Sequence, residues 1–235
     1  MPASFKELAI FKDLPPDAVS EVENCGILRN FEEGQILFIR GGEKGKTFFV
    51  ISGEINIYRT ENGKRITLYD LREGDFFGDL SFTQHPGTES LILENSARAE
   101  TASSVCVIAT ETFWKILKKF PELAMVVLVA LRDKLHHAES RIKDLALSAA
   151  ETRVINELIR YALRRGTFKD GFYEINDKLT HQDISEMVGV SRETVTKNLI
   201  ELERLGFIEY APGRFIRLNR EKIIRDCINC LKMAQ

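Results

Sequence analysis

The stretch PELAMVVLVALRDKLHHAESRIKDLA (residues 121–146) decides how this chain is organised. Its apolar residues recur at alternating steps of four and three, which is the spacing of a parallel coiled-coil seam and narrower than the stripe of an ordinary surface helix. Pro121 and Glu122 suit a first helical turn, and neither Gly nor Pro interrupts the residues that follow. A core helix of a monomer is the alternative, although such a helix needs fewer heptad steps. We therefore predict one long helix that pairs with its own copy along Leu128, Leu131, Leu135, Ala138, Ile142 and Leu145.

The chain before this helix has the pattern of a β protein. Runs rich in Ile, Val, Phe, Tyr and Thr, such as TFFVISGEINIYRT (residues 47–60), alternate with glycine-containing turns over residues 25–110. That pattern is typical of an antiparallel barrel or roll, flanked here by short helical pieces over residues 4–27 and 112–120. The glycines of GGEKGKT (residues 41–47) lack the spacing of a phosphate-binding loop and lead into a strand, so we interpret them as a turn.

Composition limits the function further. With 235 residues, 44% hydrophobic and 29% charged, the chain can form two domains with their own cores. A net charge of −2 excludes a general coat for DNA, so any DNA contact must be local. There is no signal peptide and no long apolar run, from which we expect a cytoplasmic protein without a membrane partner.

The segment LTHQDISEMVGVSRETVTKNLIELERLG (residues 179–206) predicts two helices joined by a tight turn. Thr180 caps the first helix, Gly189 permits the turn, and Ser191 caps the second helix. In the second helix, Val195 and Leu199 fall on the inner face. This arrangement is that of a helix-turn-helix, whose second helix enters the major groove of DNA.

The outer face of the second predicted helix carries the groups that read bases. Arg192 can donate two hydrogen bonds to guanine, Glu193 can accept one from cytosine, and Lys197 can reach a further guanine or a phosphate. An ion pair between Glu193 and Lys197, four residues apart, is the alternative use of these charges. A hairpin over residues 207–218 adds a wing whose Arg214 would meet the DNA backbone. The predicted DNA-binding residues are Thr180, Gln182, Ser191, Arg192, Glu193, Thr196, Lys197 and Arg214.

Two stretches carry a resemblance to a known family: GDFFGDL (residues 74–80) and SRETV (residues 191–195). With the order of roll, long helix and winged helix-turn-helix, they resemble the superfamily of the cyclic-AMP receptor protein and the fumarate-nitrate regulator (CRP/FNR). The resemblance implies an α+β chain with a β-roll sensor domain (residues 1–120), a dimerisation helix (121–147) and a DNA-binding domain (148–235). It also implies a homodimeric transcription regulator, not an enzyme, that binds a palindromic operator with TGTGA-like half-sites and acts with RNA polymerase. Lys197 stands where the family has Arg, so its base preference should be looser.

The resemblance also places an effector pocket in the roll, at Gly78, Asp79, Leu80, Ser81, Leu93 and Glu94. In nucleotide-binding members an Arg-Ser or Arg-Thr pair holds the cyclic phosphate, and here Leu93 and Glu94 occupy those positions. Glu94 would repel a phosphate that also lacks its bidentate partner. We therefore expect an effector other than cyclic AMP, and we interpret the nearby Arg98 as a surface residue of a strand.

Other cofactors of the family can be compared with the residues present. An iron–sulfur cluster needs several N-terminal cysteines, and only Cys25 stands there. The carbon-monoxide sensor shares an N-terminal proline, here Pro2, but has a haem-ligating His where this chain has Leu80. Other candidate ligands, each of which packing or solvation also explains, are His85, His136, His137, Cys106 and the pair Cys227 and Cys230. The effector thus stays open between haem with a gas such as nitric oxide, an apolar molecule and none, and a nucleotide-binding module without an operator is the remaining alternative.

Overall fold

A computed structural model describes residues 5, 8–39, 42–43, 45–78, 95–213 and 215–226. These residues form two compact units, Met1–His136 and His137–Gln235, and the long helix α3 (Pro121–Leu147) begins in the first and ends in the second. In both units every strand pairing is antiparallel. In the described part of the chain, no helix has the length and apolar character needed to cross a membrane.

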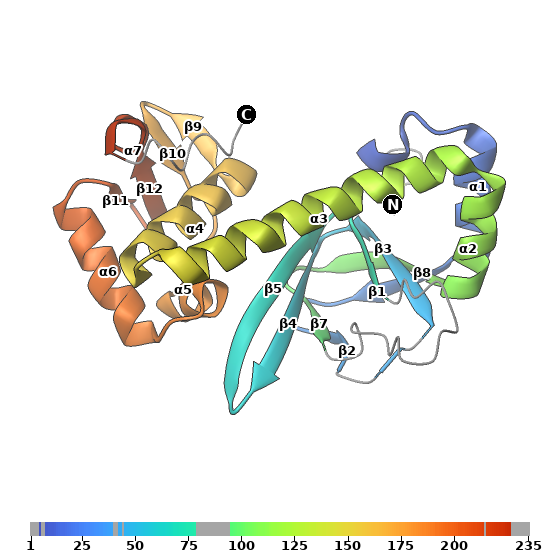
Figure 1. The fold of residues 1–235 in the computed structure, drawn as a ribbon, viewed down its shortest axis with the longest axis horizontal. Coiled ribbons are helices and arrows are strands. Elements are labelled where there is room, and N and C mark those ends of the chain that lie inside the picture. Colours follow the sequence, from blue (N-terminus) through green and yellow to red (C-terminus); the bar gives the residue numbers. More distant parts are fainter. Residues whose placement is uncertain are drawn as a thin grey trace. The chain divides into compact units, whose positions relative to one another are not determined.

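The first unit is a β-roll of two four-stranded sheets, with strand orders β1-β8-β3-β6 and β2-β7-β4-β5 (Figure 1). Its strands are β1 (Ile27–Phe31), β2 (Ile36–Phe38), β3 (Lys46–Ser52), β4 (Glu54–Glu61), β5 (Lys64–Arg72), β6 (Phe76–Gly78), β7 (Ser96–Ala99) and β8 (Ser103–Ala109). Its helices, besides the start of α3, are the 3-10 turn η2 (Ala9–Phe11), α1 (Pro16–Cys25) and α2 (Thr110–Lys119). The antiparallel roll and the long helix that the sequence predicts are both confirmed.

Strand β3 explains why its sequence is an unbroken apolar run. Successive side chains of a strand point to opposite faces, so Phe48 and Val50 enter the interior between the two sheets. Phe49 and Ile51 face the other way, into a core formed with η2, α1, α2 and the start of α3. Because this sheet is covered on both faces, no position in the middle of β3 needs a polar residue.

The second unit packs helices against a small sheet of order β11-β12-β10-β9 (Figure 1). Its elements after α3 are α4 (Ala150–Arg165), β9 (Thr167–Lys169), β10 (Phe172–Glu174), α5 (His181–Val188), α6 (Arg192–Arg204), β11 (Ile208–Ala211), β12 (Phe215–Asn219) and α7 (Arg220–Asp226). Its core joins α4, α5 and α6 to the sheet. The predicted helix-turn-helix is α5 and α6, and the predicted wing is β11 and β12.

Candidate nucleic-acid interface

The turn between α5 and α6 is set by local chemistry. The Thr180 hydroxyl accepts a hydrogen bond from the Asp183 backbone N–H (3.1 Å), and the Asp183 carboxylate accepts one from the Thr180 N–H (2.8 Å). This reciprocal capping box satisfies two donors at the start of α5. Gly189 then takes a left-handed conformation (φ 72°), and the Ser191 hydroxyl accepts from the Thr194 N–H (3.2 Å) to start α6. All three predicted turn and capping residues therefore act as expected.

Burial of one face of α6 determines which residues face outward. Val195, Leu199 and Leu202 are at most 2% exposed and lie in the core of the second unit. The helix cannot rotate about its axis without exposing them, which would lose roughly 1.5–3 kcal/mol for each side chain. Arg192 and Lys197 are consequently held on the exposed side.

Glu193 lies on the same exposed face and is oriented by the start of the helix. Its own backbone N–H and the Ser191 side chain, together with the charge of Arg192, lower the pKa of its carboxylate. Within the described residues, Glu193 forms no ion pair with Lys197, so the structure does not contain the surface ion pair given above as the alternative. The Glu193 carboxylate is thus ionised at neutral pH and can only accept hydrogen bonds.

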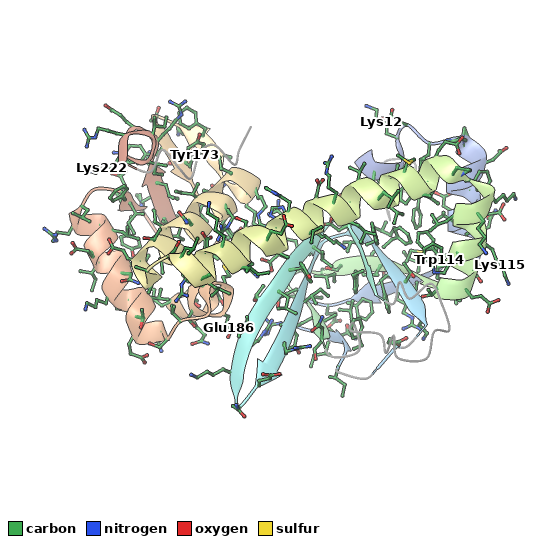
Figure 2. All side chains as sticks on the ribbon, in the orientation of Figure 1. Lys12, Trp114, Lys115, Tyr173, Glu186 and Lys222 are labelled. Carbon is green, nitrogen blue, oxygen red and sulfur yellow. The ribbon has the colours of Figure 1, made fainter. Side chains whose placement is uncertain are left out.

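Thr196 has polar partners inside the protein. Its hydroxyl donates to the Arg192 backbone carbonyl (3.0 Å) and lies 2.8 Å from Nδ1 of His181, the first residue of α5. Gln182 donates to the Glu186 carboxylate (2.9 Å) on the exposed side of α5; Glu186 is labelled in Figure 2. Sequence reasoning missed His181, because its contact with Thr196 joins residues fifteen positions apart.

Ile200 is a further residue on the outer face of α6, and it is 62% exposed. The sequence analysis did not include Ile200, although Ile200 stands four positions after Thr196 and three after Lys197 and so falls on the same helix face. The structure therefore brings together most of the predicted DNA-binding residues on α5 and α6, and it adds His181 and Ile200 to this surface. Arg214, the predicted wing contact, lies outside the described residues.

Gly78 is the one residue of the predicted effector pocket that the structure describes. This glycine ends β6 with a positive φ of 108°, and a Cβ at this position would lie 2.4 Å from the Lys46 backbone oxygen. Asp79, Leu80, Ser81, Leu93 and Glu94 lie outside the described residues, as do Pro2, His85, Cys227 and Cys230. Arg98 is a surface residue of β7, as expected, because it binds the Glu100 carboxylate (2.8 Å) while its neighbours Ala97 and Ala99 are buried.

The described interior of the roll is aromatic. Phe48 and Phe77 stack with ring centroids 4.9 Å apart, and Phe38 lies 5.5 Å from Phe48. Cys106 is buried in the other core, where burial raises the pKa of its thiol to about 12. Cys25 is exposed, and among the described residues no three His, Cys, Asp or Glu side chains are grouped closely enough to hold a metal ion.

Lys134 makes a polar contact between α3 and the roll. The Lys134 ammonium donates to the Phe76 backbone carbonyl and lies 4.4 Å from the centroid of the Phe76 ring. Burial lowers the pKa of Lys134 to about 8, against the opposing effect of the Asp75 charge. The side chain is therefore still mostly protonated at neutral pH but close to losing its charge.

These features define a class: DNA-binding proteins in which a winged helix-turn-helix follows a β-roll and a long helix. Comparison with models of known protein families gives the same two domains. A model of the cyclic nucleotide-binding domain matches residues 28–120, and a model of the Crp-like helix-turn-helix domain matches residues 152–225.

Individual relatives extend the match to most of the chain. The global nitrogen regulator of Synechococcus elongatus is 30% identical over 193 residues, which are 82% of this chain and 86% of the relative. The CRP-like cAMP-activated global transcriptional regulator of Mycobacterium tuberculosis is 27% identical over 218 residues, 92% of this chain and 95% of the relative. Among solved structures, a CooA mutant from Carboxydothermus hydrogenoformans has the same fold, with a TM-score of 0.73, 20% identity and coverage of 91% of this chain and 90% of that chain. The chain belongs to the CRP/FNR family, whose members are transcription regulators and not enzymes.

Proposed function

We propose that this protein is a homodimeric regulator that binds a palindromic operator with TGTGA-like half-sites and is controlled through its roll by an effector other than cyclic AMP. The observation that carries the proposal is the outer face of α6, where Arg192, Glu193 and Lys197 are exposed side by side above a buried inner face. Arg192 offers donors for a guanine and Glu193 offers an acceptor for a cytosine, the two bases that the G·C pairs of a TGTGA half-site present in the major groove.

The operator is tested by fluorescence anisotropy on purified protein with a TGTGA palindrome and a scrambled control. Arg192→Ala should weaken specific binding by roughly 1–3 kcal/mol for each half-site and relax the preference at one base pair. Lys169→Ala, which removes an exposed basic residue of β9, is the matched control and should leave that preference intact. Equal affinity of the native protein for both DNAs would refute the operator.

The salt dependence of binding separates this proposal from a nucleotide-binding module whose helix-turn-helix is only structural. The logarithm of the affinity should fall with the logarithm of the salt concentration, with a slope of about 0.9 for every phosphate contacted. A flat salt dependence together with tight nucleotide binding would favour the module.

The dimer is inferred from the exposed apolar side of α3. Leu128, Leu135 and Ile142 are 57%, 60% and 65% exposed and follow one another at seven-residue steps. Leu131 differs from this group because it packs partly against the core of the roll. A second copy of α3 would cover the exposed row and would place two α6 helices on half-sites about one DNA turn apart.

Sedimentation measures this seam directly. Leu135→Asp should shift the protein towards monomers, because a coiled coil would bury two carboxylates against each other. Leu163→Asp, at a 40% exposed leucine of α4 outside the seam, should stay dimeric. A Leu135→Asp protein that sediments as the native dimer would show that the subunits meet elsewhere.

The effector proposal rests on the sequence positions of Leu93 and Glu94 and is supported by the stacked rings of Phe38, Phe48 and Phe77 inside the roll. Operator binding is measured for the protein as isolated and then with cyclic AMP or haem added in turn. A visible absorption band with a changed affinity would indicate a haem-dependent gas or redox sensor, and a response to cyclic AMP at micromolar concentration would refute the proposal. Run-off transcription with added RNA polymerase then tests the polymerase as a partner and distinguishes activation from repression.

A further inference from the structure

Ile200 occupies the middle of the face of α6 that the proposed function assigns to DNA. At about 100° per residue, Ile200 lies about 80° around the helix from Arg192, between Thr196 at about 40° and Lys197 at about 140°. The buried residues Val195 and Leu202 lie about 140° and about 160° around the same helix from Ile200. An apolar side chain that is 62% exposed therefore stands among the base-reading groups rather than at the edge of the helix.

Thr196, one turn before Ile200, presents an apolar group to the same surface. Its hydroxyl carries one hydrogen, which the Arg192 carbonyl accepts at 3.0 Å. The bond to His181 at 2.8 Å must then run the other way, from a protonated Nδ1 to the Thr196 oxygen. With its hydrogen used inside the protein, the Thr196 hydroxyl has none left to donate to a base, and the methyl group is the apolar surface that Thr196 can present to a ligand.

The major groove has one apolar group that could match this pair, the C5-methyl of thymine. Polar base edges set against Thr196 and Ile200 would lose water without gaining a hydrogen bond, which is unfavourable. We propose that Thr196 and Ile200, with the Thr196 rotamer fixed by His181, select thymine at a base step next to the one read by Arg192 and Glu193. This inference rests on the proposed DNA-binding function, and it assigns a specificity-determining role to two residues and a positioning role to His181.

Deoxyuridine tests the proposal, since it removes only the C5-methyl group and keeps every hydrogen-bonding edge of thymine. Each thymine of a bound palindromic operator is replaced in turn, symmetrically in both half-sites, and affinity is measured by anisotropy at one salt concentration. Burial of one methyl group predicts a loss of about four-fold per half-site, and so about fifteen-fold for a symmetric operator, at the position that Ile200 covers.

Variants assign that loss to residues. Ile200→Ala should reduce the thymine-to-deoxyuridine ratio at that position towards one, whereas Ile224→Ala, at a 38% exposed isoleucine of α7, should leave the ratio unchanged. Thr196→Val keeps the methyl group without the hydroxyl and should retain the preference, and Thr196→Ser should lower it. His181→Ala should lower the ratio as well, because the Thr196 hydroxyl then keeps only its bond to the Arg192 carbonyl.

The possible outcomes distinguish a failure of the proposed thymine contact from a failure of the proposed DNA-binding function. If the native protein prefers no DNA sequence, the proposed function is wrong. If it binds its operator specifically but no deoxyuridine replacement changes the affinity by two-fold, the thymine contact is wrong and the function stands. A ratio that survives Ile200→Ala and Thr196→Ser would likewise overturn the assignment, leaving Ile200 as one of the isolated exposed apolar residues common on protein surfaces.

Discussion

Replacing Lys134 by methionine should change how the stability of the roll depends on pH. The ammonium of Lys134 sits against the Phe76 carbonyl and ring, and burial there lowers its pKa from 10.5 to about 8. Asp75 is the carboxylate whose charge opposes this shift. Methionine has a similar length and flexibility but no charge to bury, so the variant isolates the contribution of the proton.

The direction in which the free energy of unfolding changes with pH follows from proton binding. Below pH 8 the lysine is charged in both the folded and the unfolded chain, so its contribution does not vary with pH. Between about pH 8 and 10.5 the unfolded chain binds the proton and the folded chain does not, and the free energy of unfolding therefore rises with pH. From pH 7 to 9.5 the native protein should gain roughly 2 kcal/mol relative to Lys134→Met.

Urea unfolding followed by tryptophan fluorescence provides the assay. The chain has a single tryptophan, Trp114 of α2 (Figure 2), and it packs against the core of the roll, so the signal reports on the first unit. Protein concentration is kept constant because the stability of a dimer depends on it. Lys143→Met, at an exposed lysine of the same helix, should follow the native pH profile. Parallel profiles for native protein and Lys134→Met would refute the reasoning that burial controls this group.

Three further changes have expected outcomes. Arg160→Ala should destabilise the second unit by roughly 3–5 kcal/mol, measured by urea unfolding with far-ultraviolet circular dichroism. The reason is that the buried carboxylates of Asp144 and Glu157, which lie 2.6 Å and 2.8 Å from the Arg160 guanidinium, lose the partner they share. A loss below 1 kcal/mol would contradict this. Gly78→Ala should cost roughly 2–3 kcal/mol in tryptophan-detected unfolding, since a Cβ there meets backbone in a positive-φ conformation, and native-like stability would show that the roll relaxes freely. Thr180→Ala should lower the thermal midpoint by removing a helix cap worth about 1 kcal/mol, and an unchanged midpoint would show that the capping box is dispensable.

The sequence predicts the elements whose signals are local. The cap at Ser191, the glycine at position 189 and the apolar spacing through Leu199 lie within a few residues of one another, so they identify α6 and its outer face without knowledge of the fold. The hairpin of β9 and β10 is less well predicted. Its sequence signal is short, because the strands have three residues each and their turn passes through Asp170 at a positive φ.

Polar groups buried by tertiary contacts could not be predicted in the same way. The sequence suggests that Asp144, Glu157 and Arg160 are charges on helix surfaces. In the fold both carboxylates are buried and both pair with Arg160. Lys134 likewise falls outside the predicted seam and reads as a solvated residue. Its position against Phe76 depends on a strand fifty-eight residues earlier in the chain, which periodicity within α3 cannot reveal.

These missed contacts bear on how an effector could act on DNA. The first part of α3 is held by the roll through the buried Leu123 and Val127 and through the Lys134 contact with β6, whose last residue, Gly78, begins the predicted effector pocket. The last part is held within the second unit, where Asp144 of α3 binds Arg160 of α4. We expect a ligand that moves β6 to act on the Lys134 contact, and through it on α3. For such a ligand to regulate DNA binding it must bind the two arrangements of the roll with different affinity, so Lys134→Met should change the ratio of operator affinities with and without effector while leaving the base preference of α6 unaltered.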